Sequence, residues 1–338
     1  MIEILLAFFF ISVLLFFLGS GIWVAISMVG VSSIGMILFT SRPVGDAMAT
    51  TIWGASSSWT LTALPLFVWM GEILFRTKLS ENLFEGLAPW LQKLPGGLIH
   101  VNVVGCALFA AISGSSAATV ATVGKMSIPE LRKRKYPEKI LLGSLAGSGT
   151  LGLLIPPSII LIIYGVTVQE SIAKLFIAGI IPGIMIALIF MGYVIVWSLL
   201  NKNKMPTNYE NFSFLNKLSK SKQLIPVILL ILGVIGSIYT GIATATEAAS
   251  LGVVGALILS YFQKSLTLKT FKDSLLGATK TSCMIAFILA GATFLSLAMG
   301  FTGLPRNLAL WIQNMELSPY VLIFVLMIFY IILGMFLD

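Results

Sequence analysis

Charged residues are scarce in this sequence, and it has a single histidine and two cysteines. Only 10% of its 338 residues are charged while 58% are hydrophobic, whereas soluble domains carry about 25% charged residues. The mean hydropathy is +1.01. A water-soluble globule is therefore excluded. Apolar runs long enough to cross a bilayer recur along the chain, which predicts an all-α polytopic membrane protein.

The cysteines and the missing motifs exclude several kinds of chemistry. Cys106 and Cys283 both lie inside apolar runs, so they form neither a disulfide framework nor a metal cage, and we expect them to be small buried packing residues. No ATP-binding P-loop, metal motif or redox pair is present. We therefore expect no catalytic residue and no organic cofactor, and the energy for any active process must come from an ion gradient or from another chain.

The net charge of +8 is distributed in a way that argues against a nucleic-acid partner. Only Arg42, Lys174 and Arg306 lie outside four basic clusters, which fall within residues 76–93, 125–139, 202–222 and 264–280. Short loops rich in Lys and Arg stay on the cytoplasmic side of a membrane. The four clusters are therefore predicted to be cytoplasmic, and counting crossings back from the first cluster puts the N-terminus in the periplasm.

Most of the apolar runs read as ordinary crossings. The runs predicted to cross the membrane are 4–18, 22–39, 61–75, 175–200, 224–239, 248–262 and 282–299. Two amphipathic stretches, 80–95 and 304–316, each carry a Trp and are predicted to lie at the membrane interface. A final run, 319–338, enters from the outside.

Residues 97–136 do not read as an ordinary crossing, because this apolar stretch begins and ends beside cytoplasmic basic sequence. Its first arm, 98–112, is about 22 Å long as a helix, too short for a hydrocarbon core of about 30 Å. We predict a re-entrant hairpin that turns at the Ser-Gly-Ser-Ser tip, residues 113–116. The alternative is a pair of tight helices whose small residues pack their contact.

The run 140–166 contains Gly-Ser-Gly-Thr at 147–150 and the pair Pro156-Pro157. Two prolines remove two backbone donors and force extended geometry before them, so the helix is predicted to break near mid-membrane. Unwound carbonyl oxygens suit a cation, and half-helix N-termini suit an anionic group. The alternative is a kink with a purely structural role.

Two pairs of residues have helical charge or capping spacing. Glu72 and Arg76 stand at i, i+4 and are predicted to pair at a helix end. Thr244 and Glu247 have the spacing of a capping box, which favours a structural role for Glu247 over an ion or proton site.

The order of elements repeats: two crossings, a third crossing, an interfacial helix, then a segment that enters the membrane. The first copy enters from inside and the second from outside, which is the inverted-topology repeat of many secondary transporters. The second copy lacks the return arm of its hairpin and a counterpart of the break.

Four segments carry a resemblance to a known family. Residues 111–119 (AISGSSAAT), 154–165 (LIPPSIILIIYG), 241–249 (GIATATEAA) and 334–338 (GMFLD) resemble the large membrane (M) subunit of tripartite ATP-independent periplasmic (TRAP) transporters, the DctM-like family. The resemblance implies an elevator-type, sodium-coupled importer in the bacterial inner membrane. It also implies a small four-helix membrane subunit and a periplasmic binding protein that delivers an organic acid. Family members continue past the last motif, so a chain lacking its C-terminal part is expected.

The resemblance also implies residue roles. Sodium is expected at Ser113, Gly114, Ser115, Ser116, Gly147, Ser148, Gly149, Thr150 and Asp338, and substrate at Thr119, Pro157 and Ser158. The chemistry agrees for the first repeat, because sodium is a hard cation suited to carbonyl and hydroxyl oxygens, and proton coupling would need a titratable group at mid-membrane, where none is present. An anionic substrate entering a negative-inside cell needs cotransported cations, and we expect at least two sodium ions per carboxylate.

The expected organisation has five parts. Residues 1–96 supply scaffold helices and an interfacial arm helix, 97–200 the transport hairpin, broken helix and following span, and 201–223 a cytoplasmic loop. Residues 224–316 supply the scaffold and arm of the second repeat, and 317–338 the first arm of a second hairpin. Membrane lipid is the remaining expected partner.

Two other classes compete with a transporter. An intramembrane hydrolase would pair Ser115 with His100, the only histidine, but about 22 Å of helix separates them, far beyond the roughly 3 Å that such a pair needs. His100 is instead expected at the membrane interface, at the hairpin base. A passive channel or scaffold subunit is the other alternative, and accumulation of substrate against a gradient distinguishes it from a transporter.

Overall fold

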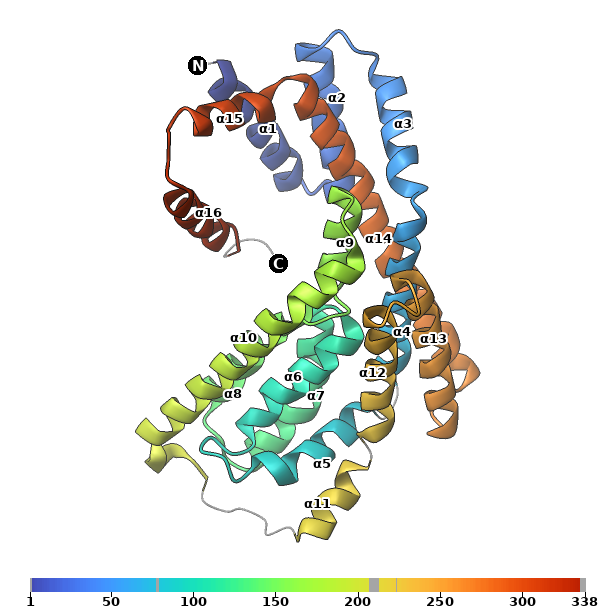
Figure 1. Ribbon diagram of the computed structural model, residues 1–338, viewed down its shortest axis with the longest axis vertical. Coiled ribbons are helices and arrows are strands. Elements are labelled where there is room, and N and C mark those ends of the chain that lie inside the picture. The colour runs from blue at the N-terminus through green and yellow to red at the C-terminus, as the bar shows by residue number, and fades with distance from the viewer. Residues whose placement is uncertain (1, 77–78, 207–212, 223, 335–338) are drawn as a thin grey trace. The chain divides into compact units, whose positions relative to one another are not determined.

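The computed structural model describes residues 2–76, 79–206, 213–222 and 224–334, and within them it contains helices and loops but no β-strand (Figure 1). The helices of the first half are α1 Ile2–Gly19, α2 Val24–Phe39, α3 Val44–Ser56, η1 Trp59–Thr62, α4 Ala63–Phe75, α5 Leu79–Leu91, α6 Ile99–Ser113, α7 Ser116–Lys133, α8 Glu138–Gly149, η2 Thr150–Leu153 and α9 Ile159–Val168. Those of the second half are α10 Ile172–Leu200, η3 Lys202–Lys204, α11 Phe214–Ser221, α12 Ile225–Tyr239, α13 Ala245–Phe262, α14 Leu268–Phe301, α15 Leu304–Gln313 and α16 Pro319–Gly334.

The chain divides into two compact units. Unit 1 comprises Met1–Ser56 and Ala286–Asp338. Its described core is built around Met36, Phe294 and Ala298, which are fully buried. The α2 helix packs closely on α14, because a Cβ added at Gly291 would lie 2.8 Å from the Ala25 carbonyl oxygen. No residue of α16 is buried.

Unit 2 comprises Ser57–Ile285, and α6 lies at its centre. Nearly every residue of α6 is buried, and the helix packs against α4, α5, α7, α8 and α10. The α4 helix also packs against α13. A helix that is apolar on all sides is buried in protein or lipid, and α6 is covered by protein.

Several helices match the length of a bilayer crossing. Among the described residues, Ile172–Leu200, Ala245–Phe262 and Leu268–Phe301 are each long and apolar enough to cross alone, and up to five crossings result if two bent helix pairs each count as one. The α10 helix alone is about 43 Å long. The all-helical, polytopic membrane class predicted from composition is confirmed.

Three helical segments were not predicted from the sequence. Residues 44–56 form α3 although no helix was expected there, and α11 lies within the expected loop 201–223. The α14 helix begins at Leu268, not near residue 282. Its first turns carry lysines, which resemble a cytoplasmic loop by charge, but no proline interrupts them and the helix continues. The five-part functional division stays a prediction.

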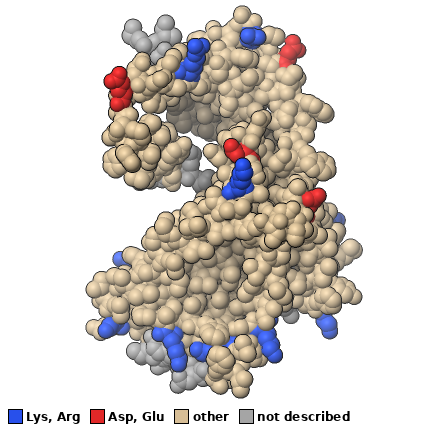
Figure 2. Space-filling view, in the orientation of Figure 1, with Lys and Arg blue, Asp and Glu red and all other residues tan. Residues whose placement is uncertain are grey.

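The distribution of charge on the surface is typical of a membrane protein, and one of the two cysteines is exposed. On the face shown in Figure 2, Lys and Arg gather at the end of unit 2 that holds α5 and α11, and a broad band without charge lies beside it. Cys106 is buried as expected, but Cys283 is exposed, so its expected packing role is wrong. An apolar segment can lie against lipid as well as against protein. The apolar sequence around Cys283 therefore does not require its side chain to be buried in the protein.

Candidate functional site

The chain reverses between α6 and α7 as a hairpin. Gly114 caps α6 with a left-handed φ of +60°, a conformation that glycine adopts without the cost of a Cβ. Ser115 is extended and caps α7, its hydroxyl accepting a hydrogen bond from the Ala118 backbone at 3.4 Å. The predicted turn at residues 113–116 is confirmed in its geometry.

The hydroxyl groups at this tip form hydrogen bonds with one another and with the backbone of the tip. The Ser113 and Thr119 hydroxyl oxygens lie 2.9 Å apart, and the Thr119 hydroxyl donates to the Ser115 carbonyl at 2.7 Å. Both side chains are buried, with Thr119 fully so. This network fixes the conformation of the tip and places oxygen atoms of three residues in one small volume.

The predicted break in the next apolar run is also confirmed in its geometry. The α8 helix ends at Gly149, a short 3-10 segment follows, and α9 begins only at Ile159. Ser158 caps α9 and its buried hydroxyl donates to the Leu153 carbonyl at 2.6 Å. The bond spans the Pro156-Pro157 pair, so it closes the unwound segment on itself.

The hairpin tip and the break pack directly against each other. The Ile159 backbone N–H donates to the Gly114 carbonyl at 3.3 Å. A Cβ at Gly114 would lie 2.8 Å from the Pro157 carbonyl oxygen, and one at Gly152 would lie 2.8 Å from the Ser115 carbonyl oxygen. The two irregular segments predicted separately from the sequence therefore form one region of touching backbones.

The geometry of this region places opposite helix ends together. The C-terminal ends of α6 and of α8 with η2 carry partial negative charge, and the N-terminal ends of α7 and α9 carry partial positive charge. Free carbonyl oxygens suit a small hard cation, and free amides suit an anion. The region can thus offer both kinds of partner without any ionised side chain.

Two of the predicted residues, Gly147 and Ser148, point away from the hairpin tip, whereas Thr150 begins the break itself. The Ser148 hydroxyl donates to the Ser144 carbonyl at 2.6 Å and lies 3.4 Å from the Asn102 carbonyl, so it faces the first half of α6. Gly147 packs against Phe190, and the exposed Thr150 hydroxyl donates to the Gly147 carbonyl at 2.7 Å.

Three further predicted positions complete the set. Gly149 meets the Val120 side chain on α7, close to the tip, and Ser116 begins α7 beside Ser115. Asp338 lies outside the described residues.

Two residues near the site were not predicted. Buried Asn102 donates to the Leu141 carbonyl at 3.2 Å and to the Ser144 hydroxyl at 3.0 Å, tying α6 to α8. A polar residue within a short apolar arm is the signal that could have found it. Gly71 of α4 lets the hairpin approach, because a Cβ there would lie 3.1 Å from the Ser113 Cα; a glycine in an apolar helix gives no comparable signal.

The other singled-out residues have structural partners. Glu72 and Arg76 pair at 3.1 Å, and Thr244 with Glu247 forms the predicted capping box. His100 is fully buried in the first turn of α6, at the base of the hairpin, with Nε2 2.8 Å from the Pro95 carbonyl oxygen, and its position at the membrane interface stays a prediction. Glycines 96 and 97 turn the chain tightly there, and this packs the ring into the protein.

A broken helix that meets a helical hairpin at small residues inside a membrane protein is a feature of many secondary transporters. Residues 10–338 match the family described as "Tripartite ATP-independent periplasmic transporter, DctM component", and the chain belongs to this family. The family is a transporter permease and not an enzyme, which dismisses the hydrolase alternative. Membership of this family makes the chain a multi-pass protein of the bacterial inner membrane that acts in binding-protein-dependent secondary transport.

Several named relatives align over most of the chain. It is 32% identical to the C4-dicarboxylate TRAP transporter large permease protein DctM of Pseudomonas aeruginosa, covering 91% of this chain and 72% of the relative. It is 32% identical to the sialic acid TRAP transporter large permease protein SiaM of Vibrio cholerae, covering 94% and 74%. It is 31% identical to the isethionate TRAP transporter permease protein DctMQ of Oleidesulfovibrio alaskensis, covering 95% and 50%.

Proposed function

We propose that this chain is the translocation subunit of a sodium-coupled symporter that imports an organic acid. The observation that carries the proposal is the direct packing of the hairpin tip on the helix break, with Ile159 N–H bonded to the Gly114 carbonyl at 3.3 Å. Carbonyl and hydroxyl oxygens from the two segments supply ligands that suit sodium, and the N-termini of α7 and α9 favour a carboxylate nearby.

The ion sites follow the predicted residues. The first sodium would bind among Ser113, Gly114, Ser115, Ser116, Gly149 and Thr150, with Gly147 and Ser148 supporting α8 from behind. Asp338 would contribute to a second ion. Thr119, Pro157 and Ser158 border the same region and would contact substrate.

Sodium coupling also follows from electrostatics. Moving one charge across 100 mV is worth about 2.3 kcal/mol, so a negative-inside cell opposes entry of a carboxylate. Cotransport of at least two sodium ions per monocarboxylate reverses the sign of the transferred charge. The names of the relatives, which include a C4-dicarboxylate and a sialic acid permease, support an organic acid as the substrate.

The mechanism and partners complete the proposal. The hairpin and broken helix would move as one body against scaffold helices in an elevator cycle, since hydrogen bonds and close glycine contacts join them. A small four-helix membrane subunit would complete the scaffold, and a periplasmic binding protein would deliver the acid.

The test is uptake by the chain reconstituted with its partner subunits in proteoliposomes. Candidate acids are supplied with their binding protein under a sodium gradient and, in a second set, with potassium replacing sodium. We expect accumulation against the substrate gradient with sodium only. Equal uptake in both sets contradicts the coupling, and equilibration without accumulation indicates the passive-channel alternative.

A matched pair of variants addresses the ion site. Thr150 and Thr167 are both exposed threonines that donate to a carbonyl three or four residues earlier in the chain, at 2.7 Å and 2.8 Å. Thr150→Ala is expected to raise the sodium concentration for half-maximal uptake by about fivefold, the equivalent of one lost ligand contact of about 1 kcal/mol. Thr167→Ala is expected to leave it unchanged, and equal behaviour of the two variants removes Thr150 from the site.

A further inference from the structure

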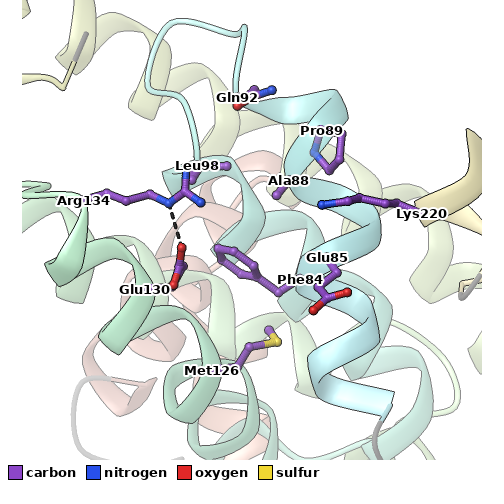
Figure 3. A pocket seen from close by; sticks show the side chains of 10 residues that line it. All are labelled: Phe84, Glu85, Ala88, Pro89, Gln92, Leu98, Met126, Glu130, Arg134 and Lys220. Carbon is purple, nitrogen blue, oxygen red and sulfur yellow. Dashed lines mark hydrogen bonds and ion pairs between the residues drawn. The ribbon is translucent and has the colours of Figure 1, made fainter. Parts of the chain in front are cut away.

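A cavity of about 370 Å³ lies away from the candidate site, between α5, α7 and α11 of unit 2. Figure 3 shows its side chains, which combine an apolar floor with four charges. The side chains that decide its chemistry are Phe84, Glu85, Met126, Glu130, Arg134 and Lys220. Its volume is within the usual range of small-molecule sites, which is about 300–1,000 Å³.

The charges of the cavity are arranged in two opposing sets. Arg134 Nε donates to Glu130 at 2.8 Å, and both side chains are about one-third exposed. Figure 3 shows Arg134 and Lys220 reaching into the cavity from opposite walls, with Phe84 and Ala88 between them and the Glu85 carboxylate to one side. Two cations that converge on one space suit a phosphate group, and the carboxylate beside them suits a cation.

The composition of α11 indicates that the cavity lies at a membrane surface. Phe214, Leu215 and Leu218 are exposed on this short helix, which also carries lysines 217, 220 and 222. A basic helix with exposed apolar side chains is typical of a segment that lies at the headgroup level. The Trp90 ring on α5 holds α11 against α5. Its indole N–H donates to the Ser221 hydroxyl at 2.7 Å, and the Lys217 ammonium lies over the ring, 5.4 Å from its centre.

We propose that this cavity binds the headgroup of a phospholipid that carries a primary amine, of the phosphatidylethanolamine type, from the cytoplasmic leaflet. The phosphate would lie between Arg134 and Lys220, and the ammonium would bind Glu85. An anionic glycerol headgroup would leave Glu85 without a cation, and a choline headgroup has no N–H to donate to it. The site involves none of the residues proposed for sodium or substrate.

The experiment measures lipid binding directly. The chain is purified in detergent, stripped of lipid and titrated with phosphatidylethanolamine, phosphatidylglycerol, phosphatidylcholine or inorganic phosphate, and bound lipid is counted by native mass spectrometry. One phosphatidylethanolamine per chain is expected to bind more tightly than either other lipid. Equal affinity for all three lipids, or binding of inorganic phosphate that competes fully with them, overturns the proposal.

Variants on one helix give the control. Lys220→Gln removes a cation that lines the cavity and is expected to weaken phosphatidylethanolamine binding by about fivefold, as for a loss of about 1 kcal/mol per basic residue. Lys222→Gln removes the same charge two residues away, outside the lining, and is expected to bind as the unaltered chain does. Equal losses in both variants indicate attraction to the general surface charge and overturn the site.

The role of the Glu85 carboxylate is tested through the lipid preference of a variant. Glu85→Gln is expected to abolish the preference for phosphatidylethanolamine over phosphatidylglycerol while phosphatidylglycerol still binds, a change of specificity that misfolding does not produce. An unchanged preference overturns the assignment of the amine to Glu85. Thermal unfolding of each variant in detergent, without lipid, reports whether the fold is retained.

Discussion

Gly114 stands where the backbone turns with a φ of +60° and touches the neighbouring break. An alanine there would meet the Pro157 carbonyl oxygen at 2.8 Å and the Ile159 nitrogen at 3.1 Å. Both contacts are to backbone, which cannot rotate away as a side chain can. The residue therefore determines how closely the hairpin and the broken helix approach.

Gly114→Ala is expected to lower the free energy of unfolding by about 1–2 kcal/mol from left-handed strain alone, with a further loss from the contacts. Thermal unfolding in detergent measures it. Gly143→Ala is the control, because Gly143 lies inside α8 with open space around its Cβ position, and it is expected to stabilise by about 0.5–1 kcal/mol. Equal effects of the two changes would contradict this role of Gly114.

At the scale of single residues, the spacing of polar residues predicted side-chain contacts only where both partners belong to the same helix. The Thr244–Glu247 box and the Glu72–Arg76 pair were predicted because both partners share one helix. The direction of Ser148 toward α6 and the links from Asn102 to α8 were not predicted, because they join helices separated by about forty residues in sequence.

At the scale of elements, α13 begins with a reciprocal cap. The Thr244 hydroxyl accepts from the Glu247 backbone at 3.3 Å, and the Glu247 carboxylate accepts from the Thr244 backbone at 2.8 Å. Thr244→Ala is expected to destabilise the protein by about 1 kcal/mol, measured by thermal unfolding.

Glu247→Gln separates the cap from an ion site. Glutamine also completes a capping box, so stability, uptake and sodium dependence are all expected to stay close to those of the unaltered chain. A loss of sodium dependence with the fold intact would mean that Glu247 binds an ion.

The helices themselves were predictable to different degrees. The α6–α7 turn and the α8–α9 break followed from glycine, serine and proline, which change the allowed backbone wherever they occur. The α3 helix was missed because Val44–Ser56 is rich in small and polar residues, and its apolar content is too low for the periodicity of a membrane helix. The first turns of α14 were not predicted because their lysines are typical of a loop. Basic residues indicate the cytoplasmic side of the membrane, but they do not end a helix.

At the scale of the whole molecule, the basic clusters predict the side of each loop. Glu170 precedes α10 and Lys204 follows it, so cysteines at these two positions are expected to react only from the periplasm and only from the cytoplasm, respectively. Membrane-impermeant maleimide on intact cells and inverted vesicles measures this, in a background with Cys283 replaced by alanine. Labelling of both from one side would contradict the topology.

The same labelling tests the elevator motion. Ala117 is exposed beside the hairpin tip, and a mobile hairpin is expected to make a cysteine at this position reactive from either side, with sodium changing the ratio. Reaction from one side only, under every condition, would indicate a fixed hairpin.

The sequence by itself determined the membrane class, most crossings and both irregular segments, since these depend on composition and on the local backbone limits of proline and glycine. Tertiary structure alone decided that the two segments touch, which of their hydroxyl groups face the contact, and that a charged cavity forms between α5, α7 and α11. The physical reason is that the rotation of each helix about its axis is set by packing against helices distant in sequence. A pattern along one chain segment carries little information about that packing.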